Sequence, residues 1–316
     1  MSKSEVAVDY TDVREQIRSR SGSVASRKVR ERIIEAVMFL CAAFSVAVTA
    51  GIVWVLVYES WHFFKSVSII DFLTDTQWTV LFENPRYGIM PLVTGTLVTS
   101  MIALVVALPL GTIIAIYLSE YANSTVREIL KPILELLSAV PTVVFGYFAL
   151  LFITPMLQSI LPELPGFNML SAGIVIGIMI VPYISSLSED AMKAVPVTIR
   201  EGSYAMGATR VQTALRVLIP AAFSGIASAY VLGFSRAVGE TMVVALAAGT
   251  QPNLTLNPME GAATITAYIV QVSLGDLPHG SVAYQSIFAA GLTLMVMTLV
   301  FNIGGYFLRK RFREIY

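Results

Sequence analysis

The stretch Phe234-Ser235-Arg236-Ala237-Val238-Gly239-Glu240-Thr241-Met242 decides the fold, because it carries two opposite charges inside an otherwise uncharged run from 220 to 249. A helix rises about 1.5 Å per residue and a bilayer core is about 30 Å thick, so this run predicts a membrane-spanning helix. Each charge at its centre costs about 2.5–3.5 kcal/mol, so Arg236 and Glu240 should face protein or a wet cavity. They form a structural pair that joins two helices, or they lie on the route of a transported solute.

The composition indicates an integral membrane protein. Of the 316 residues, 56% are hydrophobic and 13% are charged, whereas soluble domains carry about 25% charged residues. The single cysteine, Cys41, excludes an intrachain disulfide. We therefore expect an all-α membrane protein.

Six apolar segments predict six transmembrane helices. They are approximately 33–58, 91–117, 132–156, 172–187, 221–249 and 283–308. Pro141 is expected to kink the third segment and to act as a helix hinge. The fourth segment is short for a full span, and its end after Pro182 is expected to continue as an irregular or tilted helix.

Lys and Arg residues set the expected orientation. Eighteen of the 21 lie in the two tails and in the loops after the second and fourth segments, and two lie in the opposite loops. By the positive-inside rule, both termini are expected to be cytoplasmic.

The remaining boundaries follow from the same segments. Residues 1–32 predict a flexible basic cytoplasmic tail, and 33–58 the first transmembrane helix. Residues 59–90 predict an extracytoplasmic loop whose aromatic residues form an interfacial belt. Residues 263–274 predict a short helix at the outer surface, and 309–316 a short cytoplasmic tail.

The longest inner stretch, 188–219, predicts two short helices joined by a turn. Pro196 is typical of a helix start, and Gly207 is typical of the turn. Apolar residues recur on one face of the second helix, at Val211 and Leu215. A rigid helix-turn-helix of this kind is suited to receiving force from a soluble partner.

Within this stretch, Glu201-x5-Gly207-x9-Val217-x-Ile219-Pro220 resembles the EAA loop, E-A-A-x3-G-x9-I-x-L-P, of permease subunits in binding-protein-dependent ABC importers. Gly202 and Ser203 replace the two alanines. The resemblance implies the type I importer (MetI-like) permease fold for 91–308, with a coupling loop at 194–220 that docks on an ATPase. The coupling positions would be Glu201, Gly202, Ser203, Gly207 and Pro220. Glu201 alone also suits the start of a helix, so its role stays open.

Three further stretches resemble the phosphate permeases, more closely the PstC type than its partner PstA. They are AIYLSEY (115–121), VPYI (181–184) and GFSRAVGETM (233–242). The resemblance implies import of inorganic phosphate across the bacterial inner membrane, with Arg236 and Glu240 on the phosphate pathway. The implied partners are a PstA-like permease, a PstB-like ATPase dimer and an extracytoplasmic PstS-like phosphate-binding protein. ATP and Mg²⁺ would bind the ATPase subunits, and no cofactor would bind this chain.

The residues themselves exclude several activities. No lysine follows a glycine, which excludes the G-x4-G-K-[ST] phosphate loop of ATPases. His62 and His279 lie in outer loops without acidic or cysteine partners at ligand spacing, so neither a metal site nor a Ser–His–Asp triad is expected. We therefore expect no enzyme activity from this chain.

An anion that crosses a low-dielectric barrier needs a compensating cation and hydrogen-bond donors. Arg236 offers five donors in a planar fork, and Glu240, one turn away on the same face, would neutralise Arg236 when no anion is bound. We hypothesise a latch in which phosphate competes with Glu240 for Arg236. The alternatives are a permease for sulfate, molybdate or phosphonate, an ion-coupled secondary transporter, and a membrane scaffold or phosphate sensor.

Overall fold

The computed structural model describes residues 10–311 except 81, 83 and 276, and the side chains of 27–311 except those three and 308. Within these residues all regular elements are helices, and one isolated antiparallel bridge joins Trp78 to Tyr87. The all-α class is therefore confirmed.

Four helices in the described ranges are long and apolar enough to cross a membrane, and two bent helix pairs bring the number to six if each pair is one span. The four are 27–66 of α1, 90–121, α7 (Met169–Lys193) and α14 (Val282–Arg311). The first bent pair, 124–138 with 142–158, turns by 85°, and the second, 210–221 with 223–238, turns by 76°. Four predicted segments correspond to the four long helices, the third (132–156) falls on the first bent pair, and the fifth (221–249) includes only the second helix of the other pair.

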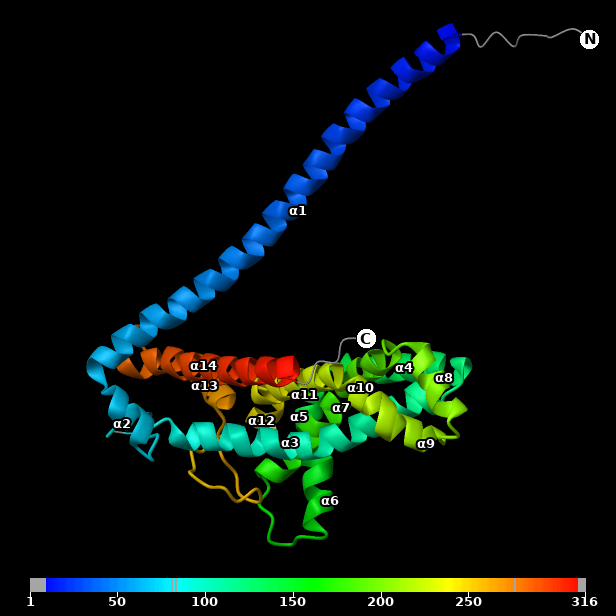
Figure 1. Cartoon of the computed structure of the whole chain (residues 1–316). Helices are drawn as coiled ribbons and strands as arrows, with labels where there is room; N and C mark the ends of the chain where they lie inside the picture. The colour runs from blue at the N-terminus through cyan, green and yellow to red at the C-terminus, as the bar shows by residue number, and fades with distance from the viewer. Residues whose placement is uncertain (1–9, 81, 83, 276, 312–316) are drawn as a thin grey trace, which may run out of the picture. The chain divides into compact units, whose positions relative to one another are not determined.

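The first helix, α1, runs over Tyr10–Ser66 (Figure 1). Residues 10–32 are therefore helical, which corrects the expectation of a flexible tail. An apolar helix extends cheaply once nucleated, and the ion pair between Arg27 and Glu31, 3.0 Å apart and one turn from each other, supports the extension. Residues 1–9 and 312–316 of the expected tails lie outside the described residues.

The chain divides within α1 into two compact units, Met1–Val55 and Leu56–Tyr316. In the first unit the apolar side chains are exposed along the helix, with Phe39 71% exposed. A helix that is apolar on all sides is typical of a membrane span. All the site residues described below belong to the second unit.

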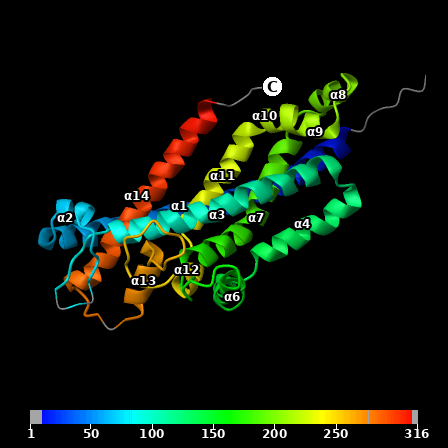
Figure 2. The ribbon, with the colours of Figure 1, turned by 90° about the horizontal axis from the view of Figure 1, so that it is seen from below.

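Two long helices, α3 (Met90–Ile116) and α7, lie side by side at the centre of the second unit (Figure 2). Glycines on α7 allow this approach. A Cβ built on Gly173 would lie 2.6 Å from Ile102 of α3, and one on Gly177 would lie 2.7 Å from Val106. Small residues at such positions are typical of helix contacts in membranes.

The helix α7 continues without a break through Pro182 to Lys193. The expected continuation is therefore a regular helix and not an irregular one, and its expected tilt stays a prediction. The added turns carry Glu189, whose side chain is fully buried against cations of its own and a neighbouring helix. These cations compensate the buried charge of Glu189, so α7 can continue beyond the end of the fourth apolar segment at residue 187.

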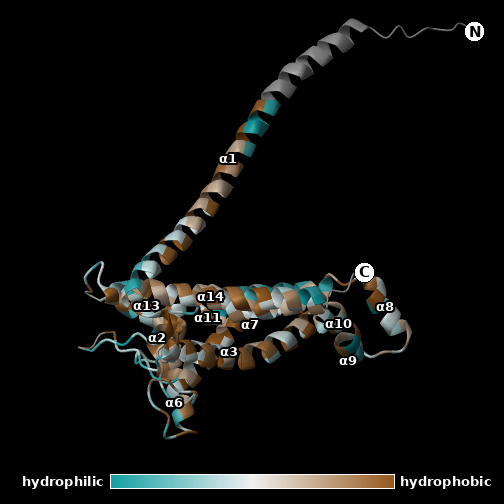
Figure 3. Cartoon of the chain, turned by 60° about the vertical axis from the view of Figure 1, so that its left-hand side comes forward, coloured by the Kyte–Doolittle hydropathy of each residue, from teal (hydrophilic) through white to brown (hydrophobic). Residues whose placement is uncertain are grey.

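Several of the shorter helices lie at the two ends of the bundle, and hydrophobic residues line the long helices between these ends (Figure 3). One end carries the π-helix η1 (Tyr117–Tyr121), α4 (Ser124–Ser138), α8 (Val197–Ala205), α9 (Arg210–Thr213), π-helix η3 (Ala214–Leu218) and α10 (Ile219–Ala221). The opposite end carries α2 (Ile69–Thr74) and α13 (Ile265–Ser273). Between them lie α5 (Thr142–Phe148), π-helix η2 (Ala149–Ile153), α6 (Thr154–Gln158), α11 (Phe223–Val238) and α12 (Met242–Ala247).

Pro141 caps the start of α5 with an extended backbone, φ −57° and ψ 134°. A proline ring disfavours helical backbone in the residue before it. The predicted kink is therefore confirmed in position, but it is a full break. The role of Pro141 as a hinge stays a prediction.

The aromatic residues of loop 59–90 form a core of their own. Phe63, Phe72 and Trp78 are buried, and the rings of Trp78 and Tyr268 on α13 have centroids 4.9 Å apart. The expected belt is therefore only partial, with Trp61 66% exposed. The short helix predicted over 263–274 is confirmed as α13, but it is packed into this core.

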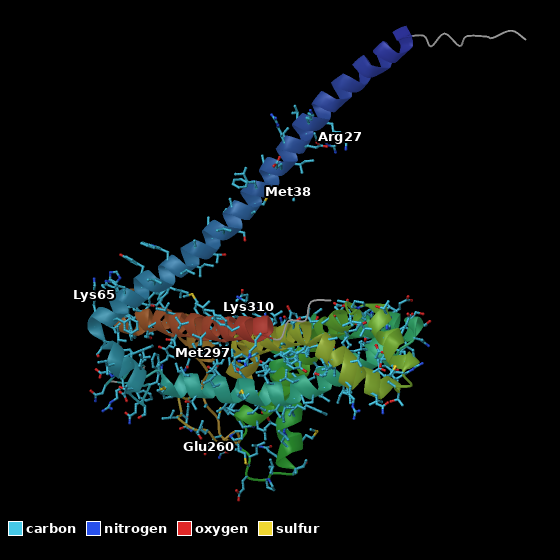
Figure 4. All side chains as sticks on the ribbon, viewed as in Figure 1. Arg27, Met38, Lys65, Glu260, Met297 and Lys310 are labelled. Atoms are coloured by element: carbon cyan, nitrogen blue, oxygen red, sulfur yellow. The ribbon has the colours of Figure 1, made fainter. Side chains whose placement is uncertain are left out.

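The loop between α12 and α13 is held in place by hydrogen bonds. Figure 4 shows Glu260 in this loop. Hydrogen bonds, the largest contribution from Thr255 and the next from Asn257, hold the pKa of Glu260 below its ordinary value. The backbone carbonyl of Glu260 accepts a bond of 3.0 Å from the amide of Met169, so the loop fixes the start of α7.

Candidate functional site

Arg236 lies in the last turn of α11, partly buried against α7. Its guanidinium carbon sits 5.4 Å from the centroid of the Tyr183 ring. This distance is within the range of a cation–π interaction. The structure therefore brings together two of the stretches singled out in the sequence, 181–184 and 233–242.

The chain breaks between Arg236 and Glu240, because α11 ends at Val238 and α12 begins at Met242. The expectation of one helix over 221–249, with both charges on one face, is therefore wrong. Gly239 is the C-cap of α11, with φ −87° and ψ 0°, a conformation that does not require glycine. No ion pair joins Arg236 to Glu240 in the described part of the chain.

Glu240 is 7% exposed and is held by backbone amides. Its Oε1 accepts hydrogen bonds from the amides of Met242, at 3.1 Å, and Val243, at 3.3 Å. A carboxylate at a helix start satisfies amides that have no partner within the helix. The resting state of the hypothesised latch, with Glu240 closed onto Arg236, is thus not the arrangement found here.

A network of threonines ties the break to two other helices. Thr266 of α13 donates a bond of 2.6 Å to the backbone carbonyl of Glu240. Thr264 and Thr266 are joined through their hydroxyls at 3.1 Å. Thr96 of α3 accepts a bond of 3.0 Å from the amide of Ile265. The backbone around Glu240 is therefore connected through α13 to α3.

The two broken helices pack against each other. A Cβ built on Gly146 of α5 would lie 2.7 Å from Leu246 Cδ1 and 3.2 Å from the carbonyl oxygen of Met242. The segment that follows the Pro141 break therefore contacts α12, the segment that follows the Glu240 break.

The predicted helix-turn-helix at 194–220 is present as α8 and α9. Gly207 turns the chain with φ +82°, in the left-handed region that favours glycine. Ser203 points inward, and its hydroxyl lies 2.8 Å from that of Thr213, which holds the two helices together. The other four predicted coupling positions, Glu201, Gly202, Gly207 and Pro220, are exposed.

Glu120 was not singled out in the sequence, yet it connects α8 to the end of α3. Its side chain is 2% exposed, and its Oε1 lies 3.2 Å from Arg200 Nε. Its Oε2 accepts a bond of 3.0 Å from the hydroxyl of Tyr204. Burial, followed by the Glu120 carboxylate, raises the pKa of Tyr204 above its ordinary value. In the sequence, this residue was indicated only by its position in 115–121, one of the stretches that resemble the phosphate permeases.

Glu189 is a second missed residue, and its side chain is fully buried. Arg127 Nε and Lys131 Nζ of α4 lie 3.4 and 3.3 Å from its carboxylate oxygens, and Lys193 pairs with it one turn along α7. Lys131 also pairs with Asp190 at 2.9 Å. The cluster fastens α4 to α7. In the sequence, this cluster was indicated by the acidic pair Glu189 and Asp190, which lies just after the fourth apolar segment.

No group of three or more His, Cys, Asp or Glu residues in the described ranges could hold a metal ion. The Glu189 cluster is cationic in excess.

Comparison with known proteins places this arrangement in a family. Residues 107–314 match the family described as binding-protein-dependent transport system inner membrane component. The chain is 36% identical over 276 residues to the probable ABC transporter permease protein YqgH of Bacillus subtilis, covering 87% of this chain and 88% of that protein. It is 30% identical over 315 residues to the phosphate transport system permease protein PstC of Mesorhizobium japonicum, covering 92% and 94%.

Solved structures show the same fold at low sequence identity. A chain of a bacterial alginate ABC transporter is 18% identical, with a TM-score of 0.59 over 85% of this chain and 95% of that chain. A chain of the MetNI methionine ABC transporter is 19% identical, with a TM-score of 0.53 over 72% and 94%. The expected type I permease fold is thus confirmed. The chain belongs to the family of binding-protein-dependent transport system inner membrane components, the permease subunits of ABC importers.

Proposed function

We propose that this chain is a PstC-like permease subunit that carries inorganic phosphate inward across the cytoplasmic membrane. Arg236 is the observation that carries the proposal, because it is a partly buried cation in the helical bundle, held over Tyr183. ATP would be hydrolysed with Mg²⁺ on a PstB-like ATPase dimer. A PstA-like permease and an extracytoplasmic PstS-like phosphate-binding protein would complete the importer, with both termini of this chain cytoplasmic.

The geometry of Arg236 suits an oxyanion. The guanidinium contacts the ring of Tyr183, and no described residue accepts a hydrogen bond from its N–H groups. The donors in the guanidinium plane are therefore available, and they match the oxygens of phosphate. Glu240, held by the amides of α12, contributes a nearby negative charge that favours release, and a solute bound too tightly cannot leave. Phosphate would thus bind Arg236 without first displacing Glu240.

The exposed coupling positions Glu201, Gly202, Gly207 and Pro220 are proposed to face the ATPase, with Ser203 fixing the loop from within. The pairing of α8 and α9 through Ser203 and Thr213 makes the loop one rigid body. ATP-driven movement of the ATPase would reach the membrane helices through this body.

Replacement of Gly207 by valine is expected to reduce phosphate transported per ATP hydrolysed, while the ATPase still binds. A β-branched residue at φ +82° is strained by about 1–3 kcal/mol, although a Cβ there meets nothing within 4 Å. Gly280→Val is the matched control, because Gly280 also has a positive φ, +83°, and open space but lies outside the coupling loop. A wild-type transport ratio in Gly207→Val would contradict a coupling role for the turn.

The proposed function is tested with the complete importer in proteoliposomes and a panel of oxyanions. We expect uptake of phosphate that requires ATP and is inhibited by vanadate, and no uptake of sulfate, molybdate or phosphonate. Uptake of one of those anions instead would assign another substrate. Uptake driven by an ion gradient without ATP would identify a secondary transporter, and phosphate-dependent signalling without uptake would identify a sensor.

A further inference from the structure

The π-helix η1, at the end of α3, receives three contacts from the coupling loop. Arg200 and Tyr204 of α8 both reach the carboxylate of Glu120. The guanidinium carbon of Arg210, at the start of α9, lies 5.9 Å from the centroid of the Tyr121 ring. Both helices of the coupling loop are therefore attached to the same five residues.

Glu120 is the centre of this attachment. Its side chain is 2% exposed, so its charge must be compensated by its neighbours. Arg200 provides the opposite charge at 3.2 Å, and the hydroxyls of Tyr204 and Ser119 donate bonds of 3.0 and 3.2 Å. Displacement of α8 without η1 would leave a buried carboxylate uncompensated, so the two elements should move together.

The opposite end of α3 is linked to the break that holds Glu240 through residues 263–266. A Cβ built on Gly95 would lie 2.4 Å from the carbonyl oxygen of Ala263, so the backbones touch. The hydroxyl of Thr96 accepts a hydrogen bond from the amide of Ile265. The hydroxyl of Thr266 donates a hydrogen bond to the backbone carbonyl of Glu240. The whole of α3 is an uninterrupted helix of 27 residues, and its part from Thr96 to η1 is about 30 Å long at 1.5 Å per residue.

A second connection leaves the coupling loop by the chain itself. After α9, η3 and α10 lead directly into α11, which bends away by 76° and ends with Arg236 in its last turn. This covalent connection reaches Arg236 without passing through Glu120. The coupling loop is thus linked to Arg236 and to Glu240 by two different helices.

We propose that Glu120 is the joint through which the coupling loop moves α3, and that α3 carries this movement to the Glu240 break. Arg236 is moved separately, through α10 and α11. The i to i+5 bonding of a π-helix has poorer geometry than that of an α-helix, and such turns are often found at functional sites. The inference rests on the proposed coupling of this permease to an ATPase and makes Glu120, Arg200 and Tyr204 positioning residues.

The first test measures phosphate transported per ATP hydrolysed by the complete importer. Glu120→Gln is expected to lower this ratio by about tenfold, within the 5- to 150-fold range of typical couplings between sites. The charge-swapped double variant Glu120→Arg, Arg200→Glu is expected to recover part of it. Glu128→Gln is the control, because Glu128 is an exposed acid of α4. An unchanged ratio in Glu120→Gln would overturn the proposal.

The second test follows the two connections separately with nitroxide labels in a Cys41→Ser background. One label is placed at Gly239 in the break and the other at Leu232 on α11, both exposed. ATP binding should change the mobility of both labels in the otherwise unchanged importer. In Glu120→Gln, the Gly239 label should lose its response and the Leu232 label should keep it. Equal responses at Gly239 with and without Glu120 would refute the joint. Because the labels report on ATP alone, this result is independent of which solute is transported.

Discussion

Arg236→Gln is expected to lower phosphate uptake by about 10- to 100-fold in an importer that still assembles. A hydrogen bond to a charged group contributes about 1.5–3 kcal/mol, and each 1.4 kcal/mol is about tenfold. Glutamine removes both the charge and the planar fork, and the loss of one such bond to phosphate accounts for a decrease in that range. The measurement is labelled phosphate uptake, with co-purification of the ATPase as the check on assembly.

Three companion variants separate the contributions. Arg236→Lys keeps the charge without the fork and should retain intermediate uptake. Tyr183→Leu removes the ring beneath Arg236 and should reduce uptake less than Arg236→Gln. Arg311→Gln alters an exposed arginine at the end of α14 and should have no effect. Wild-type uptake by Arg236→Gln would remove Arg236 from the pathway.

Two substitutions of Glu240 separate the effect of its charge from its hydrogen bonds to the start of α12. In Glu240→Gln the amide oxygen still accepts from Met242 and Val243, so the start of α12 should persist. Only the charge that favours phosphate release is lost, and uptake should slow while phosphate binding tightens. Glu240→Leu should also disturb α12. Unchanged transport in both variants would show that the carboxylate has no part in passage.

Removal of two lysines around Glu189 is expected to destabilise the protein more than removal of Glu189 itself. Glu189 is fully buried, whereas the Lys131 and Lys193 side chains are 28% and 35% exposed and can reach solvent. A buried charge that loses its partners costs about 3–5 kcal/mol. Lys131→Met with Lys193→Met should lower the free energy of unfolding by that order, as measured by denaturation of the solubilised complex.

Addition of Glu189→Gln to the double-lysine variant should recover most of the lost stability, because the uncompensated acid is then gone. Lys310→Met, at the exposed end of α14 (Figure 4), is the control and should stay within about 0.5 kcal/mol of wild type. If the triple variant is as unstable as the double variant, the buried charge is not the cause.

The long helices could be predicted from the sequence because span length and apolar composition determine them. Segments 91–117 and 283–308 correspond to α3 and α14 within a few residues. The turn at Gly207 was predictable because the backbone there requires φ > 0.

The breaks at Gly239 and Pro141 show where pattern reasoning fails. The apolar run continues on both sides of 239–241, whereas the backbone carbonyl of Glu240 is bound at the break by Thr266, 26 residues away. Pro141 could be recognised locally, but not the 85° turn, which depends on how α5 packs on α12. Contacts between residues so far apart in the sequence produce no periodic pattern from which they could be predicted.

For the candidate site, the charged residues could be predicted from the sequence, but their distant partners could not. The charges of Arg236 and Glu240 stand out in an apolar run, but their partners, Tyr183 and the α12 amides, emerge only from the fold. Glu120 and Glu189 lie at the ends of apolar segments, where acids usually face water. Tyr204, 84 residues from Glu120, is one of the partners that reveal the burial.

The buried Glu189 also sets an order for biosynthesis. Lys131 is synthesised 59 residues before Asp190, so the cations of α4 have left the ribosome when the acidic end of α7 emerges. α7 on its own carries two acids against Lys193 alone. Burial of Glu189 therefore has to await α4 beside α7, because Arg127 and Lys131 of α4 provide two of its three cations.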